Sequence, residues 1–167
     1  RIPLQTARKW AKEVHYRHLG RSYFAVGLKN LSDGFALRNK HSKRNIHPQD
    51  IAAPWVIEDS SLLAVFEGMM DLLSFHALNP LRSMNTLVLN STNMSERAIS
   101  YIQSKIPTRV ELYLDHDQAG RESTDLFVEK LSALGIDVRD CSDFYQDYAD
   151  LNLFFSLSSA EDLLIQN

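Results

Sequence analysis

Three acidic residues of this 167-residue chain follow runs that are typical of buried strands. Glu67 comes directly after the apolar run of residues 62–66, and Asp115 and Asp117 come directly after the run of residues 110–114. One residue separates the two aspartates, so in extended backbone both carboxylates project to one side while His116 points away. Because open α/β sheets bind ligands at the carboxyl ends of their strands, the three carboxylates are predicted to converge there.

Converging carboxylates predict a site for a divalent cation. Carboxylates a few ångströms apart repel each other unless a cation neutralises them. Mg²⁺, or Mn²⁺, suits such a site, because Mg²⁺ prefers oxygen ligands, takes few carboxylates and shares its coordination with substrate phosphate. A second interpretation stays open, in which Glu67 and Asp117 only stabilise the N-termini of the helices that follow them.

The elements that would position these acids alternate along the second part of the chain. Buried-strand runs predict strands over 62–66, 86–89, 110–114 and 136–139, and helical periodicity predicts helices over 69–78, 95–105, 118–134 and after residue 152. Strand–helix repetition with short connections indicates an α/β fold, a parallel four-stranded sheet with helices on both faces.

The first part of the chain has a different pattern. Apolar spacing predicts a helix over residues 6–18, capped by Gly20. Alternation predicts a β-hairpin of residues 22–29 and a run around residues 35–37, joined by a turn that contains Asp33-Gly34. With Pro48 and Pro54 marking a linker, the sequence divides into a basic helix-plus-hairpin subdomain, 1–55, and a core, 56–167.

Charge is distributed unevenly between these parts. Residues 1–50 hold 11 lysines and arginines against 3 acidic residues, a balance of +8, whereas residues 51–167 hold 7 against 18, a balance of −11. A basic face attracts phosphate backbones and an acidic cluster attracts divalent cations. Two solvated charged faces are the alternative. The candidates for nucleic-acid contact nearest the core are Arg38, Lys40, Lys43 and Arg44, and the aromatic residues Tyr23, Phe24 and Phe35 either stack on bases or pack in the core.

Composition excludes several classes of protein. With 44% hydrophobic and 23% charged residues, the chain is not a disordered, collagen-like or coiled-coil protein. Its longest apolar runs are far shorter than the roughly 20 residues of a membrane span. Cys141 is the single cysteine and no signal peptide is evident, so a reducing cytoplasmic setting is expected. Because the sequence starts at Arg1, we expect a piece of a longer protein.

Two segments resemble the motifs of the TOPRIM family. Residues 62–71, LLAVFEGMMD, resemble its first motif, a strand that ends in Glu-Gly with an Asp four residues after the Glu. Residues 112–120, LYLDHDQAG, resemble its second motif, the Asp-x-Asp strand end followed by Ala-Gly. The middle strand of that family corresponds to residues 86–91, TLVLNS. The resemblance implies a TOPRIM fold, which is Rossmann-like.

The region before this core resembles primase-like proteins of mobile elements. The similar stretches are residues 23–38, YFAVGLKNLSDGFALR, then Lys43 and residues 47–51, HPQDI. Such proteins often carry an upstream CHC2-type zinc finger, which the resemblance implies for a longer protein. It also implies Mg²⁺-dependent nucleotidyl transfer on single-stranded DNA during replication or mobilisation of DNA. The implied partners are a DNA template, nucleotides and a replicative helicase or other mobile-element proteins, with no membrane.

The resemblance assigns roles to individual acids. It implies that Asp115 and Asp117 hold the metal and that Glu67 is a further ligand or a general acid/base. Asp150 is a candidate second-metal ligand, although its acidic loop is equally consistent with solvation. The expected supporting residues are Asp71, Asn90 and Asn152.

Three of the expected contacts have open alternatives. Asp71 lies next to the site or on a helix surface, and Asn90 ends a strand at the site or is a turn amide that bonds its own backbone. Arg121 reaches a phosphate or pairs with Asp125 four residues later.

One position departs from the family pattern. Relatives commonly carry Lys-Asp-x-Asn late in the domain, whereas this chain has Ala149-Asp150-Leu151-Asn152. A lysine at that position could contact a phosphate as a point charge. Its absence leaves two alternatives beside the primase-like enzyme, a TOPRIM nuclease that uses the same acids and a catalytically degenerate TOPRIM module that binds nucleic acid or protein.

Overall fold

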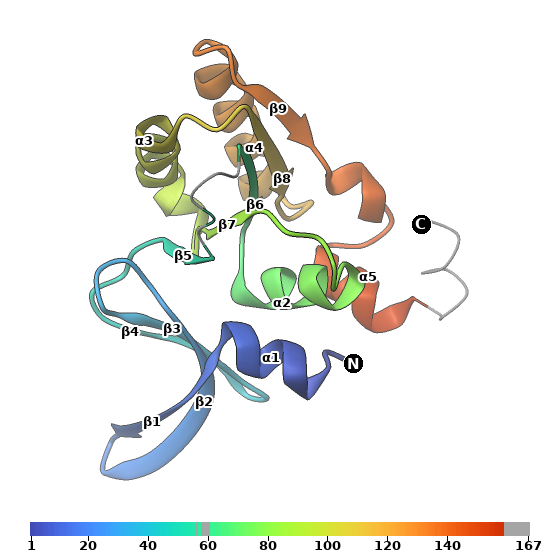
Figure 1. The fold of residues 1–167 in the computed structure, drawn as a ribbon. Coiled ribbons are helices and arrows are strands. Elements are labelled where there is room, and N and C mark those ends of the chain that lie inside the picture. Colours follow the sequence, from blue (N-terminus) through green and yellow to red (C-terminus); the bar gives the residue numbers. More distant parts are fainter. Residues whose placement is uncertain (56, 58–60, 159–167) are drawn as a thin grey trace.

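Two sheets of different construction form the framework of the molecule (Figure 1). The computed structural model describes residues 1–55, 57 and 61–158. The predicted boundary at residue 56 and the last nine residues of the predicted core, 159–167, lie outside these described ranges. No helix within them is long and apolar enough to cross a membrane.

The larger sheet contains the predicted parallel strands. Its order is β5-β7-β6-β8-β9, and β7, β6, β8 and β9 run parallel to one another. These four elements confirm the predicted parallel sheet. The bounds are β6 Leu62–Phe66, β7 Asn85–Val88, β8 Arg109–Tyr113 and β9 Asp137–Asp140.

Helices cover both faces of this sheet, as predicted. Successive β6 residues alternate between two cores, because neighbouring side chains of a strand point to opposite faces. Ala64 and Phe66 belong to the core with α2 and α5, and Leu63 and Val65 belong to the core with α3 and α4. The helices are α2 Met69–Leu78, α3 Ser95–Lys105, α4 Gln118–Ser132 and α5 Leu151–Leu157.

The sequence missed a fifth strand of the larger sheet. Strand β5, Ala52–Trp55, pairs antiparallel with β7 inside the segment that was predicted to be a linker. Pro54 argues against a strand at this position in the sequence, since proline cannot donate a backbone hydrogen bond. The position at a sheet edge explains why proline is tolerated there.

The N-terminal sheet contains four strands, of which the sequence predicted two. The antiparallel order is β1-β2-β3-β4, so the chain passes through three consecutive hairpins. The predicted hairpin between β2 and β3 is confirmed. The basic segment after it forms a further hairpin between β3 and β4. The bounds are β1 Lys12–His18, β2 Arg21–Lys29, β3 Phe35–Asn39 and β4 Ser42–Ile46.

The predicted helix over residues 6–18 is wrong in its second half. Helix α1 spans Leu4–Trp10, and residues 12–18 pair with β2 in β1. Gly20 does not cap a helix. Leu19 and Gly20 have φ values of 47° and 75°, which place both in the two-residue turn that joins twisted strands. The cross-strand pairing of seven residues outweighed the local helical periodicity.

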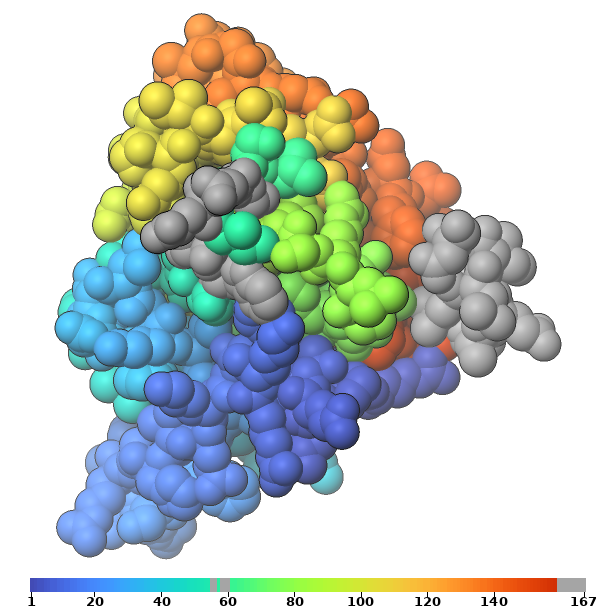
Figure 2. Space-filling view, in the orientation of Figure 1, coloured from blue at the N-terminus to red at the C-terminus, as the bar shows by residue number. Residues whose placement is uncertain are grey.

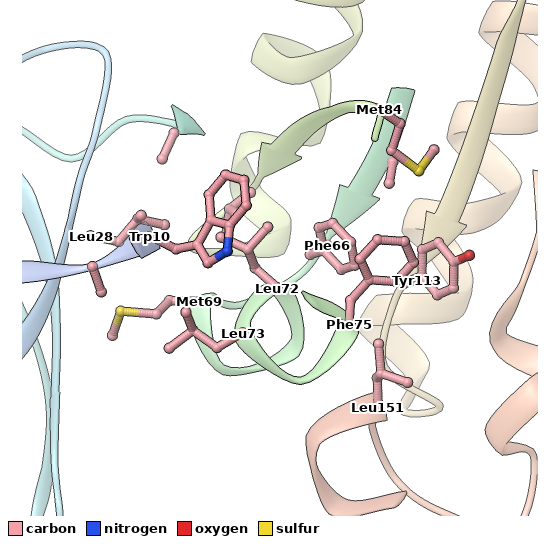
Figure 3. Close-up of a cluster of buried hydrophobic side chains, with 14 of the residues drawn as sticks. Trp10, Leu28, Phe66, Met69, Leu72, Leu73, Phe75, Met84, Tyr113 and Leu151 are labelled. Atoms are coloured by element: carbon pink, nitrogen blue, oxygen red, sulfur yellow. The ribbon is translucent and has the colours of Figure 1, made fainter. Parts of the chain in front are cut away.

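Helix α1 packs the N-terminal subdomain against the core. Trp10 stacks on His76 of α2 with ring centroids 3.8 Å apart, and both side chains are buried. Trp10 and Leu28 of β2 share one apolar cluster with Leu72 and Phe75 of α2 (Figure 3). Burial and the charge of Lys9 lower the pKa of His76 to about 4. This contact fixes the position of the basic sheet relative to the larger sheet.

We expect Trp10→Ala to lower the free energy of unfolding by about 3–5 kcal/mol, because it removes a large buried ring at the junction of the two parts. Denaturant unfolding followed by circular dichroism measures the change. Leu81→Ala is the control, since Leu81 is 97% exposed and its truncation should change stability by less than about 0.5 kcal/mol. Equal stability of the two variants would show that the stack does not join the subdomains.

Candidate active site

Glu67 and Asp115 meet at the carboxyl edge of the larger sheet. Strands β6 and β8 are parallel neighbours whose register pairs Phe66 with Tyr113. Each acid therefore leaves its strand at the same end of the sheet. The backbone N–H of Asp115 donates to Glu67 Oε2 at 3.4 Å. The buried strands bring these two sequence-predicted residues together.

Asp117 has the capping role that the sequence left open. Its Oδ1 accepts a hydrogen bond from the Gly120 backbone N–H at 2.8 Å, at the N-terminus of α4. A Cβ at Gly120 would lie 2.0 Å from the Asp115 carbonyl oxygen, so glycine is required for α4 to begin this close to β8. This cap uses one oxygen of Asp117.

Asp71, Asp150 and Asn152 join the starts of α2 and α5. Asp71 is buried, with 6% exposed, and its Oδ1 accepts from the Asn152 backbone N–H at 3.1 Å. Asp150 caps α5 by accepting from the Leu153 N–H at 2.6 Å. The Asn152 side chain accepts from Ser74 Oγ of α2 at 3.2 Å. The structure therefore excludes the helix-surface alternative for Asp71.

Burial and neighbouring carboxylates raise the pKa values of Asp115, Asp71 and Glu67. Burial, with the charges of Asp71, Glu67, Asp150 and Asp117, raises the pKa of Asp115 to about 8. Burial and the charges of Asp150 and Glu67 raise the pKa of Asp71 to about 7. Burial is also the main cause that raises the pKa of Glu67. The acids are close enough in space to form one electrostatic unit.

The donor set fits a divalent cation. In the described part of the chain, no three His, Cys, Asp or Glu side chains are already placed to hold an ion together. The oxygens of Asp71, Asp117 and Asp150 that are not hydrogen-bonded to backbone, together with Glu67 and Asp115, are the ligand type that Mg²⁺ prefers. A bound cation would also relieve the repulsion that contributes to the raised pKa values of Asp71, Asp115 and Glu67.

Two basic residues of the N-terminal sheet act on these acids. Burial raises the pKa of Glu67, and the charge of Lys43 on β4 opposes this effect. Burial lowers the pKa of the half-buried Arg38 guanidinium, and the charge of Asp71 opposes this effect. Arg38 and Lys43 are cross-strand partners and share one face of the sheet. Arg44, the next residue of β4, faces the opposite way. The four basic residues singled out in the sequence therefore do not form one patch.

Asn90 and Arg121 contact backbone near the site. Asn90 has φ 64°, its N–H donates to the Glu67 carbonyl at 3.0 Å, and its Nδ2 donates to the Asp50 carbonyl at 2.9 Å. Its Oδ1 is buried without a hydrogen-bond partner among the described residues. The Arg121 guanidinium donates to the His116 carbonyl, a contact that the sequence did not predict.

Comparison with known proteins supports this geometry. A family model described as Toprim-like matches residues 64–155, which include all five acids. The chain belongs to the Toprim-like family. A domain of unknown function, DUF8464, matches residues 1–47. No curated protein sequence matches the chain.

The fold of this Toprim-like chain is that of primase fragments. It is similar to the crystal structure of the primase fragment of the bacteriophage T7 primase-helicase protein, with a TM-score of 0.72, 17% identity and coverage of 99% of this chain and 70% of that one. It is also similar to primase domains in a structure of the bacteriophage T7 lagging-strand DNA polymerase bound to an RNA/DNA hybrid and dTTP. That match has a TM-score of 0.70 and 16% identity and covers 99% of this chain and 85% of the other.

Sequence reasoning missed one residue that supports the site, Tyr145. Tyr145 is buried and donates to the Leu114 carbonyl at 2.8 Å, and burial with the charges of Asp71 and Asp115 raises its pKa. His116 contacts the Tyr148 carbonyl through Nδ1 at 2.6 Å, which fits the structural role expected for it. No local pattern identifies Tyr145, because its partner lies 31 residues away.

Ala149 is exposed at the position where relatives commonly carry lysine. Its carbonyl oxygen accepts from the His116 N–H at 2.8 Å, so the backbone of this segment is tied to the Asp-x-Asp turn whatever the side chain. Cations of the N-terminal sheet interact with the acids, as the effect of Lys43 on Glu67 and of Asp71 on Arg38 shows.

We expect the metal-free protein to lose stability as pH rises from about 4 to about 8. An unfolded aspartate has a pKa near 3.9, whereas the pKa of folded Asp115 is about 8, so folding takes up a proton in this window. Asp115→Asn should therefore be more stable than wild type at pH 8 in chelator, by more than about 1.4 kcal/mol, the equivalent of one pKa unit.

Thermal unfolding at pH 4 and pH 8 measures this difference. At pH 4 both proteins carry a neutral group at position 115, so their stabilities should approach each other. A variant that is less stable than wild type at pH 8 would show that Asp115 is not electrostatically unfavourable in the free protein.

Proposed function

We propose that this chain is the catalytic domain of a DNA primase-like protein, which joins nucleotides on a single-stranded DNA template in a Mg²⁺-dependent reaction. The observation that carries the proposal is the hydrogen bonding that places Glu67 beside Asp115 at the sheet edge and ties Asp71 to the start of α5, which Asp150 caps. The charge of Lys43 acts on Glu67, and the charge of Asp71 acts on Arg38. The primase-like fold adds support, and one similar structure contains primase domains with an RNA/DNA hybrid and dTTP. The free Cys141 suits a reducing cytoplasm as the proposed setting.

The proposed roles of the acids differ. Asp115, Asp117, Asp150 and Glu67 would hold Mg²⁺ or Mn²⁺, which when bound stabilises charge on the reacting phosphate and lowers the pKa of a sugar hydroxyl. As the alternative to a ligand role, Glu67 Oε2 would accept the proton of the attacking 3′-hydroxyl, since the raised pKa of Glu67 in the metal-free site favours proton uptake. Asp71 and Asn152 hold the start of α5, and with it Asp150, against α2.

A groove lies along the N-terminal sheet. It has a volume of about 670 Å³ and lies between α1 and the sheet face that carries Arg38. Phe24, 65% exposed, and Val26 provide apolar surface there. The proposed template strand follows this groove, because cations attract its phosphates and Phe24 can stack on a base. The basic residues that line the groove are Arg8, Lys12, Arg38, Lys40 and His41.

Primer synthesis on a single-stranded template tests the function. We expect the full-length protein to synthesise primers in the presence of Mg²⁺. Asp115→Asn should lower the rate of primer synthesis at least about 100-fold, because changing even a residue that only orients metal ligands lowers metal affinity or activity about 10–100-fold. DNA binding should be kept or strengthened, since the variant removes a negative charge. Synthesis that survives Asp115→Asn would contradict the assignment.

The same assay separates the alternatives. Shortening of the labelled template, without new primers, would identify a TOPRIM nuclease. Template binding without either product would identify a degenerate binding module, the function that Ala149 favours.

Ala149→Lys tests the effect of the departure from the family pattern. The side chain at this position is exposed, so the variant should fold with a stability change below about 0.5 kcal/mol. If a phosphate passes nearby, the new charge should lower the KM for nucleotides about tenfold, as expected for a hydrogen bond to a charged group. An unchanged KM would show that Arg38 and Lys43 already supply the cation that relatives place on lysine.

The basic lining of the groove predicts a salt dependence. We consider the variant in which Arg38 and Lys40, which line the groove, and Lys43, the cross-strand partner of Arg38, are replaced by glutamine. It should lower the slope of log affinity against log salt by about 2, at about 0.7 for each phosphate contact. Binding should weaken alike for all sequences, because phosphate contacts carry no base information. Lys130→Gln, on an exposed part of α4, is the matched control. An unchanged slope in the triple variant would exclude the groove as the template path.

A further inference from the structure

The N-terminal sheet has a second surface, on the face turned away from the acids. Along each strand, alternate residues point to opposite faces, and the cross-strand register aligns them between strands. Arg38 and Lys43 therefore share the face toward the acids. We call the other surface the far face; its central residues are Tyr16, Tyr23, Leu37, Arg44 and Ile46.

Two tyrosines form an aromatic platform on the far face. Tyr16 of β1 and Tyr23 of β2 are cross-strand partners whose rings are stacked, with centroids 5.6 Å apart and planes inclined by 22°. Tyr23 is 37% exposed. The β1–β2 hairpin that carries both rings projects beyond the rest of the molecule (Figures 1 and 2).

A hollow lies beside this platform. It has a volume of about 320 Å³ and is lined by Tyr16, Leu37, Ile46 and the basic residues Arg44 and His18, together with Arg17 and Asn45 at its rim. Its base is apolar and its border is cationic. A planar base that stacks on the tyrosines could enter the hollow while its phosphate meets Arg44.

The charge of the far face has one sign. All residues from 12 to 46 are described, and no strand position on the far face carries a carboxylate. Asp33 pairs with Lys29, at 2.6 Å, from the turn beyond the strands. A partner protein with an ordinary mixed surface would leave several of these cations unpaired, whereas a phosphate backbone neutralises them all. The far-face cations that do not line the groove are Arg21, Lys29 and Arg44.

We propose that the far face is a second binding surface for single-stranded DNA, on which bases stack against Tyr23 and Tyr16. It lies on the face of the sheet opposite Arg38 and Lys43, and Tyr23 also borders the groove. Duplex DNA does not fit, because its bases are stacked on one another and unavailable to side chains. The inference goes beyond the proposed function, since this binding needs none of the five carboxylates. The inference rests on the proposed function in one respect only. We choose DNA rather than RNA as the ligand because the proposed template in the neighbouring groove is DNA.

Fluorescence anisotropy with a labelled oligothymidylate of about 12 nucleotides, a length within known single-strand site sizes, tests the surface. Tyr23→Ala should weaken binding about 5- to 100-fold, the range of one lost base stack, whereas Tyr23→Phe should keep wild-type affinity. Arg44→Gln should lower the salt slope by about 0.7, and the control Lys130→Gln should leave it unchanged. Circular dichroism checks that each variant is folded.

The same titrations in an Arg38→Gln, Lys43→Gln background separate the two surfaces. If they are independent, Tyr23→Ala should cause the same fold-change in both backgrounds. Photo-crosslinking to an oligonucleotide that carries halogenated uracil, followed by peptide mapping, should label Tyr16 or Tyr23. This outcome stands even if the protein makes no primers, so failure of the proposed function and failure of this inference are distinguishable.

Three outcomes would overturn the proposal. Tyr23→Ala could bind the oligothymidylate as tightly as wild type in both backgrounds, and the crosslinks could be confined to the groove residue Phe24. The same variant could change the oligomeric state without changing DNA affinity, which would make the far face a protein interface. An oligouridylate of equal length could bind more tightly than the DNA through Tyr23, which would assign the surface to RNA.

Discussion

Repulsion among buried carboxylates is the interaction on which the rest of the structure depends. Asp71 and Asp115 lie where burial and neighbouring charge favour their neutral forms, with pKa values of about 7 and 8. The fold holds the acids there through backbone N–H groups at the starts of α4 and α5, which bond to Asp117 and Asp150. These bonds use one oxygen of each acid, so they hold the carboxylates in place without neutralising their negative charge.

The N-terminal sheet supplies the opposite charge, and apolar packing sets its position. Burial of Trp10 against His76, rather than an ion pair, holds the basic sheet beside the acidic edge. Non-directional apolar contact suits this role, because it does not use the charges that the site needs. Within the described residues, Arg38 and Lys43 can therefore act on Asp71 and Glu67 without forming a salt bridge to either.

The sequence predicted what depends on local pattern and missed what depends on distant partners. Buried strands and their terminal acids were predictable, because an apolar run followed by Glu67 or by Asp115-x-Asp117 is visible in a few residues. Strand β1 was not predictable, because its pairing with seven residues of β2 outweighs the helical periodicity of residues 6–18. Tyr145 was missed for the same reason, since its hydroxyl bonds to Leu114, 31 residues away.

The basic segment shows how secondary structure changes the meaning of a linear motif. In the sequence, Arg38, Lys40, Lys43 and Arg44 form one cluster, and a helix or loop would leave them as one patch. As β3, a turn and β4, the same residues alternate between two faces, because side chains of a strand repeat every two residues. Adjacent Lys43 and Arg44 thus belong to different surfaces, one toward the acids and one toward the tyrosine platform. A single DNA strand that binds both surfaces would therefore bend around the sheet edge at β4. Its phosphates on the two faces would contact Lys43 and Arg44, which are adjacent in the chain.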